Sequence, residues 1–301
     1  MMDKQTDSVK AGGFAKWWFR KGRFGASHLL LICFACTTLL PFLWMVLASF
    51  KPLSEVELSN PFPKAWFAGD VAQAAHSIKD NYLGVFNSKD IAFKKYYFNS
   101  VFVAAWVTLL QCFTSSLAAF AFARIRWPGR DTVFKLYLGT MMIPGVVTMI
   151  PNYTLMVKLH LLDSYLGLIV PASFSAFGVF LLRQFMLTIP LSLDEAATID
   201  GASYWQVYWD VILPLARPGL IVLSIFTFMG NYGSFFWPLV LIKSEHLRTL
   251  PIGMLYFDTM YGNQTNLIMA ASVMNILPLI ILFLIMQKHL VKGIQLGAVK
   301  G

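Results

Sequence analysis

Long runs of apolar residues without a single charged side chain dominate the pattern of this chain of 301 residues. The hydrocarbon core of a membrane is about 30 Å thick, so a helix needs about 20 apolar residues to cross it. Because lipid offers backbone amides no partners, each run is predicted to be a helix. The pattern therefore predicts an all-α integral membrane protein with six transmembrane helices. The runs cover residues 28–50, 98–123, 136–157, 165–182, 220–242 and 267–286.

The distribution of Lys and Arg predicts the orientation of these spans, because cytoplasmic loops retain positive charge during insertion. With the N-terminus inside, the inner segments hold 15 of the 24 basic residues and the outer segments hold nine. We therefore predict that both termini are cytoplasmic. The predicted organisation is a cytoplasmic N-terminal segment (1–27), a six-span domain (28–290) with outer loops at 51–97 and 243–266 and an inner loop at 183–217, and a cytoplasmic tail (291–301).

Composition supports a membrane protein and excludes an ordinary soluble domain. Apolar residues make up 57% of the chain and charged residues 13%, against roughly a quarter charged in soluble domains. The net charge of +9 is explained by its topological placement and does not indicate nucleic acid. Cys33, Cys36 and Cys112 fall in apolar runs and are predicted to pack as small hydrophobes. The Cys33–Cys36 spacing matches a redox or metal motif, but no His or carboxylate ligands accompany it.

The loop at residues 183–217 carries the most informative local pattern. Two Ser residues are each followed, three positions later, by Glu or Gln, which is the spacing of a capping box at a helix N-terminus. Gly201 separates the two predicted helices, and Pro214 is predicted to end the second. We therefore expect a short helix, a glycine turn and a second helix outside the membrane. The two pairs are Ser192 with Glu195 and Ser203 with Gln206.

A stiff element of this kind suits the transmission of force from a soluble partner, since the small Ala196 and Ala197 permit close docking. A DNA-binding helix-turn-helix has a similar turn. Acidic residues outnumber basic ones in this loop, however, and acidic charge repels phosphate. For Glu195 the alternative is a capping carboxylate that has no partner protein.

The same loop resembles the EAA loop of ABC importer permeases, in which Glu-Ala-Ala, three residues, Gly and nine residues precede Ile-x-Leu-Pro. Val211 stands where the family commonly has Ile. The similarity extends over essentially the whole chain and is that of the second membrane subunit in carbohydrate importers of the maltose type. The matching segments are Glu195-Ala196-Ala197, Gly201, Val211-Ile212-Leu213-Pro214, Met142-Ile143-Pro144, Ile150-Pro151, Gly167-Leu168-Ile169 and Leu181-Leu182-Arg183-Gln184-Phe185.

This resemblance implies a type I ABC importer permease fold with cytoplasmic EAA coupling helices, in the bacterial inner membrane. It implies one half of a translocation pathway for a mono-, oligo- or polysaccharide. The implied partners are a sister permease, two ATPase subunits and a periplasmic solute-binding protein, with no nucleic acid. The chain itself would be no enzyme and would bind no metal or cofactor, because ATP and Mg would be bound by the partner ATPases.

The resemblance also implies three groups of site residues. In the family the first helix of the loop docks on the ATPase, the fifth span contributes to the pathway, and the last outer loop faces the binding protein. Family members often have Trp-Asn-Asp/Glu-Phe where this chain has Tyr232-Gly233-Ser234-Phe235. The docking residues are Asp194, Glu195, Ala196, Ala197, Asp200, Gly201, Leu213 and Pro214; the pathway residues are Asn231, Tyr232, Ser234 and Phe235; the loop residues are Tyr256, Tyr261, Asn263 and Gln264.

Alternatives remain at two points. Asn231 and Ser234 could instead hydrogen-bond a neighbouring helix. The whole chain could also be a self-contained secondary carrier or channel, but neither inverted halves nor a charge in the middle of a span is evident. No phosphate-binding glycine loop and no catalytic cluster of His or carboxylates is found. The loops do not choose among neutral sugars, oligosaccharides and polyuronates such as alginate.

Overall fold

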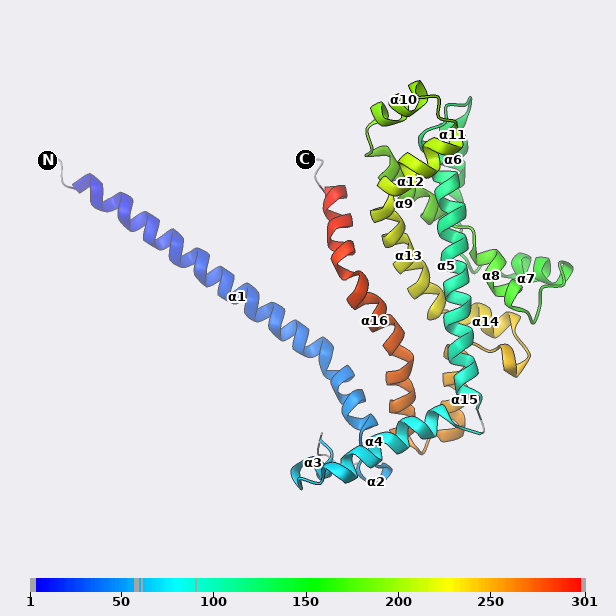
Figure 1. The fold of residues 1–301 in the computed structure, drawn as a ribbon. Coiled ribbons are helices and arrows are strands. Elements are labelled where there is room, and N and C mark those ends of the chain that lie inside the picture. Colours follow the sequence, from blue (N-terminus) through cyan, green and yellow to red (C-terminus); the bar gives the residue numbers. More distant parts are fainter. Residues whose placement is uncertain (1–3, 57–59, 61, 90, 299–301) are drawn as a thin grey trace. The chain divides into compact units, whose positions relative to one another are not determined.

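The computed structural model describes the backbone of residues 4–56, 60, 62–89 and 91–298, and the side chains of 27–56, 60, 62–89 and 91–287. Within these ranges helices are the only regular secondary structure, and there is no strand (Figure 1). The predicted all-α class is therefore confirmed. The side chains of residues 1–26, in the predicted N-terminal segment, and those of the predicted tail lie outside the described residues.

Three of the described helices are long and apolar enough to cross a membrane, and the number rises to five if each of two bent pairs counts as one span. The long helices are α1 (Lys4–Ser49), α5 (Phe93–Ala123) and α16 (Thr265–Ala298). The first pair is α8 (Tyr165–Ala172) with α9 (Ala176–Leu187), bent by 42°. The second joins Tyr204–Leu215 to α13 (Arg217–Tyr232), bent by 74°.

The apolar run at 136–157 does not form one helix. It is divided among α6 (Arg130–Gly139), the short 3₁₀ helix η1 (Thr140–Met142) and α7 (Met149–Lys158). Pro144 explains the break, because a proline disfavours the helical conformation of the residue before it, and Ile143 is extended (φ −80°, ψ 117°).

The chain divides into two compact units. The first, Met1–Tyr82 with Gln264–Val273, contains α2 (Leu53–Val56), α3 (Lys64–Phe67) and most of α4 (Val71–Phe86). The buried Asn81 amide organises it. Asn81 Nδ2 donates to the carbonyls of Ser49 and Lys51 at 2.8 Å each, and its Oδ1 accepts from Asn266 Nδ2 at 2.7 Å. The end of α1 is thereby joined to the start of α16.

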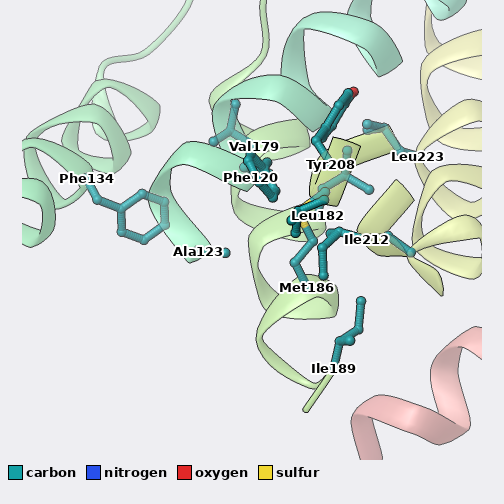
Figure 2. Close-up of a cluster of buried hydrophobic side chains, with 13 residues drawn as sticks. Phe120, Ala123, Phe134, Val179, Leu182, Met186, Ile189, Tyr208, Ile212 and Leu223 are labelled. Atoms are coloured by element: carbon teal, nitrogen blue, oxygen red, sulfur yellow. The ribbon is translucent and has the colours of Figure 1, made fainter. Parts of the chain in front are cut away.

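The second unit, Leu83–Asn263 with Met274–Gly301, is built around α5, which packs against α9 and α13. Figure 2 shows the buried core at one end of this packing, where side chains from α5, α6, α9 and the 183–217 loop interlock. The core therefore includes part of a loop that sequence patterning placed outside the membrane. Its members are Ala119, Phe120, Ala123, Phe134, Val179, Leu182, Met186, Ile189, Val207, Tyr208, Ile212, Ala216 and Leu223.

The prediction that all three cysteines pack in a core is wrong for two of them. Cys33 and Cys36 are exposed on α1, where every residue from 27 to 44 is exposed within this chain. A span that is apolar on all sides can face lipid or another subunit, so its thiols need no core of their own. Cys112 is half-buried, and its Sγ lies 3.3 Å from Ser224 Oγ. No group of three or more His, Cys, Asp or Glu side chains that could hold a metal is found among the described residues.

The close approach of α5 and α9 depends on Gly178. A Cβ at this position would lie 2.5 Å from Ser115 Oγ and 3.3 Å from Leu223 Cδ1. Overpacking of this kind costs about 1–3 kcal/mol. We therefore expect Gly178→Ala to lower the melting temperature of the detergent-purified chain, followed by circular dichroism.

Gly139→Ala is the matched control, because a Cβ at Gly139 meets nothing within 4 Å. Its melting temperature should equal or slightly exceed that of the wild type. Equal melting temperatures for the two variants would contradict a packing role for Gly178.

Candidate functional site

The 183–217 loop folds into a short helix, a glycine turn and a second helix. The first helix, α10, covers Leu191–Ile199. Gly201 follows with a φ of +84°, in the left-handed region that glycine adopts without a steric penalty. Ser203 then caps α11 (Tyr204–Gln206) in a capping box with Gln206. The predicted glycine turn at Gly201 and the predicted capping box at Ser203 are both confirmed.

Another prediction for this loop is wrong. Ser192 does not cap α10, because the N-cap is Pro190 and no side chain there accepts a capping hydrogen bond. The second helix runs through a π segment (η2, Val207–Ile212) and α12 (Leu213–Leu215), and it ends one residue after Pro214. Proline has no N–H to close a turn, and the backbone widens into the π segment just before it. The chain bends directly after α12.

The second helix of the loop is embedded in the bundle. Tyr208 and Ile212 are fully buried against α5 and α9, as Figure 2 shows. Tyr208 Oη lies 2.8 Å from Ser116 Oγ, and its ring meets Phe120 edge-on at 5.3 Å. Burial of each such side chain stabilises the fold by about 1.5–3 kcal/mol. This helix is therefore a fixed part of the core.

The first helix is much less buried and has two faces. Asp194 and Ala197, one turn apart, turn inward and are half-buried. Glu195 and Ile199 face outward, and the Ile199 side chain is 86% exposed. The predicted docking residues thus separate into two sets. Those that are exposed are Glu195, Ala196, Asp200, Gly201 and Pro214, and those that are half-buried are Asp194, Ala197 and Leu213.

An arginine that follows α5 attaches the inward face of α10 to the bundle. Arg124 Nη2 donates to the carbonyls of Met186 and Ile189, at 2.7 and 2.9 Å. Its Nη1 lies 3.4 Å from Asp194 Oδ2, and the Arg124 side chain is only 3% exposed. One guanidinium therefore connects the end of α5, the end of α9 and the start of α10.

A second arginine makes contacts in the opposite direction. Arg183 on α9 donates from Nε to the carbonyl of Phe122 at 3.2 Å, and its Nη2 lies 3.6 Å from Asp131 Oδ1. The Arg183 guanidinium also stacks 4.1 Å from the centre of the Phe134 ring. Sequence reasoning assigned no structural contact to Arg124 or Arg183 and missed both roles. The available signal was that Arg124 is the first charged residue after the uncharged run 98–123.

Burial affects both members of the Arg124–Asp194 pair. It raises the pKa of the Asp194 carboxyl, the negative charge of Glu195 raises it further, and Arg124 only partly opposes the shift. Burial also lowers the pKa of Arg124, against the influence of Asp194. Both directions disfavour the charged forms, so the mutual attraction does not fully compensate for the loss of water.

A separate cavity of about 180 Å³ lies among α5, α7, α8 and α14 (Phe236–Leu241). Asn231 and Ser234 line it, as do Asn152, Thr249 and the aromatic Trp237. A cavity of about 150 Å³ holds one benzene ring, so this one has room for a single six-membered ring. The lining combines apolar walls with a few polar groups, which is typical of small-molecule sites.

The structure brings together only two of the four predicted pathway residues. Tyr232 does not line the cavity, because its side chain is 1% exposed and its Oη donates to the carbonyl of Asn275 at 2.9 Å. Phe235 is exposed outside it. Asn231 Nδ2 donates to the carbonyl of Thr227 on its own helix, at 2.8 Å. That bond does not join it to a neighbouring helix.

The turn after α7 is fastened to the turn after α14 by Asp163. Its backbone N–H donates to the carbonyl of Leu241 at 2.9 Å. Its Oδ1 accepts from the backbone N–H groups of Lys243 and Ser244 at 2.9 and 2.8 Å, and its Oδ2 accepts from the Ser244 hydroxyl. These bonds fix the ends of two helices that line the cavity.

The predicted loop residues lie on or after α15 (Leu250–Tyr261). Tyr256 stacks against the Arg248 guanidinium at 4.1 Å, and Tyr261 Oη lies 3.2 Å from Ser88 Oγ. Asn263 and Gln264 are exposed in the connection to α16. The two tyrosines therefore make contacts within the chain, whereas the side chains of Asn263 and Gln264 are exposed.

Comparison with known proteins assigns the family. Residues 112–296 match the model of the binding-protein-dependent transport system inner membrane component. The chain belongs to this family. The resemblance to ABC importer permeases is thereby confirmed. Members of this family are non-catalytic permease subunits whose ATPase is a separate chain, so a self-contained carrier is not favoured.

Individual permeases are similar over nearly the whole chain. The arabinooligosaccharides transport system permease protein AraQ of Bacillus subtilis is 34% identical, over 92% of this chain and 95% of AraQ. The trehalose/maltose transport system permease protein MalG of Thermococcus litoralis is 32% identical, over 92% and 95%. A solved bacterial ABC transporter that imports the acidic polysaccharide alginate superimposes with a TM-score of 0.75 at 25% identity, over 87% and 94%. The permease fold therefore extends to regions outside the matched residues 112–296.

Asp163 allows a pH test of the contacts beside the cavity in this permease. The hydrogen bonds from Ser244 hold the pKa of its carboxyl below the usual range. A depressed folded pKa contributes stability above the unfolded value of about 3.9, and that contribution is lost as the pH falls through the folded pKa. Asp163→Asn should therefore lower the melting temperature at pH 7, with a difference that shrinks below about pH 4.

Asn tolerates the positive φ of 53° at this position, so the substitution isolates the charge. Asp258→Asn, which changes an exposed carboxylate on α15, is the control and should melt like the wild type. A difference between Asp163→Asn and the wild type that is the same at pH 7 and pH 3.5 would contradict the role of ionisation.

Proposed function

We propose that this chain forms one membrane half of an ATP-driven carbohydrate importer and is driven through the outward face of α10. The observation that carries the proposal is a short helix outside the bundle, joined by a left-handed glycine turn to a second helix inside the core. The carbohydrate is proposed because AraQ and MalG, named for sugar oligomers and disaccharides, are similar over 92% of the chain.

In this proposal the chain crosses the bacterial inner membrane six times, with both termini in the cytoplasm. The bent pair of α8 and α9 forms one span, α13 with α14 forms a second, and the broken segment α6–η1–α7 forms a third. The predicted segments are then a cytoplasmic 1–27, a spanning 28–290 and a cytoplasmic tail 291–301. The 183–217 loop lies on the ATPase side, and the loops 51–97 and 243–266 lie on the periplasmic side.

The proposed partners are a sister permease, two ATPase subunits and a periplasmic solute-binding protein. The exposed Glu195 and Ile199 of α10 would contact an ATPase, with Asp200 and Gly201 at the edge of that contact. ATP and Mg would be bound by the ATPases, and this chain would bind no cofactor or metal. The binding protein would meet Tyr256, Tyr261, Asn263 and Gln264.

We further propose that the cavity lined by Asn231 and Ser234 belongs to the translocation pathway. Two polar side chains beside Trp237 suit a sugar ring, whose axial C–H face stacks on an aromatic ring while its hydroxyls need hydrogen-bond partners. Tyr232 would act indirectly, by holding the end of α13 to α16 through the carbonyl of Asn275.

The coupling role is tested in the assembled complex with a charge reversal and a turn series. Glu195→Lys changes only an exposed side chain, so the complex should assemble, while sugar transported per ATP hydrolysed should fall about tenfold or more. Gly201→Ala should reduce the same ratio because a left-handed residue costs about 1–2 kcal/mol.

Gly201→Asn is the matched control of the turn series, since Asn tolerates this conformation and no neighbour lies within 4 Å. It should retain most of the coupling. Wild-type transport per ATP in Glu195→Lys would overturn the docking role of α10.

The pathway role is tested by Asn231→Ala combined with Ser234→Ala. Each lost hydrogen bond to a sugar is worth about 0.5–1.5 kcal/mol, so uptake by reconstituted vesicles at low sugar concentration should fall about tenfold. Ser224→Ala, on the same helix but outside the cavity, is the control and should transport normally. Unchanged uptake by the double variant would remove the cavity from the pathway.

A further inference from the structure

The contact between Arg124 and Asp194 links α10 to the helices of the bundle, so a movement of α10 would act on those helices through this contact. Arg124 follows the last residue of α5, and it binds the carbonyls of Met186 and Ile189 at the end of α9. Asp194 is in the first turn of α10. Beside this pair, Ala197 packs against the core, and α10 lies next to η2.

The chemistry of the pair suits arginine at this position. The end of α9 presents partial negative charge and the start of α10 presents partial positive charge. The planar guanidinium of Arg124 can donate to the carbonyls at the first and reach the carboxylate at the second at the same time. A lysine ammonium is a single point charge and cannot cover both positions in this way.

Stability alone does not explain why two charges are buried here. Arg124 Nε and Asp194 Oδ1 are buried without a hydrogen-bond partner among the described residues. The charged atoms are 3.4 Å apart, longer than a strong charge-assisted hydrogen bond of about 2.7–2.9 Å. When some polar atoms of a buried ion pair lack hydrogen-bond partners, the attraction between the charges does not offset the free energy lost by removing them from water. Replacing such a pair by apolar side chains often leaves the protein equally stable.

We propose that Arg124 and Asp194 form a buried joint that transmits displacement of α10 to the ends of α5 and α9. Arg124 is then a positioning residue for coupling, and Asp194 is the point at which α10 is held. This inference rests on the proposed docking of α10 on an ATPase. It gives Asp194 an inward role in place of direct contact with the partner.

The test compares single and double variants in the complete complex with its sister permease, ATPases and binding protein. Arg124→Gln should lower both the melting temperature and the sugar transported per ATP, the latter about tenfold. The double variant Arg124→Gln with Asp194→Asn removes both buried charges. Its melting temperature should recover toward that of the wild type, while its transport per ATP stays low. Recovery of both quantities together would overturn the joint.

Arg183→Gln is the matched control. Arg183 also joins helix ends in this region, but its partners Phe122, Asp131 and Phe134 all lie outside α10. Its loss should lower the melting temperature and leave transport per ATP near the wild-type value. An equal loss of coupling in Arg183→Gln would show general loosening and would also overturn the joint.

One further measurement separates failure of the joint from failure of the proposed function. A Cys at position 195, introduced as Glu195→Cys, should crosslink to the ATPase in the assembled complex. If the crosslink forms and Arg124→Gln couples normally, the joint alone is wrong. If no crosslink forms, the docking of α10 is wrong, and the joint is overturned with it.

Discussion

Close packing of α5 against α9 and α13 is the interaction on which the rest of the second unit depends. In a membrane, helices associate through van der Waals contact between small residues and through hydrogen bonds, because lipid tails are as apolar as the side chains they replace. Gly178 allows this approach beside Ser115. Where the α8–α9 bend frees the carbonyl of Ser173, Thr114 Oγ1 donates to it at 2.7 Å. The packing therefore also satisfies the backbone at the break, as the lipid environment requires.

These breaks produce the features on which the proposed function depends. The 74° bend before α13 turns the second helix of the 183–217 loop into the core, and the break between α13 and α14 opens beside the cavity. Asp163 then fixes two of the turns that frame this cavity. Irregular backbone in a membrane protein is tolerated where protein or an aqueous cavity surrounds it. Breaks in the spanning helices therefore account for both the bends and the cavity.

Sequence patterning predicted the helical class, the glycine turn and one capping box, because each depends on local composition or on a single residue type. It failed where the position of a helix end or the contacts of a side chain depend on the surrounding structure. Pro190 takes the N-cap position of α10 from Ser192. Arg124 was missed because a charge count treats every arginine alike, and the carbonyls that it binds lie 62 and 65 residues further along the chain. Tyr232 was misplaced because one residue along a helix turns a side chain by about 100°.

The unequal burial of the two loop helices determines which of them can move. Displacing the second helix would pull Tyr208 and Ile212 out of the core, at about 1.5–3 kcal/mol for each side chain. Displacing α10 disturbs only the half-buried Ala197 and Asp194. A force applied to the exposed face of α10 would therefore move this helix first. The force would then reach the spanning helices through the contacts between α10 and the bundle. Arg124 contacts α10 and the ends of two spanning helices at once, so in the proposed joint its three contacts set the direction of the transmitted movement.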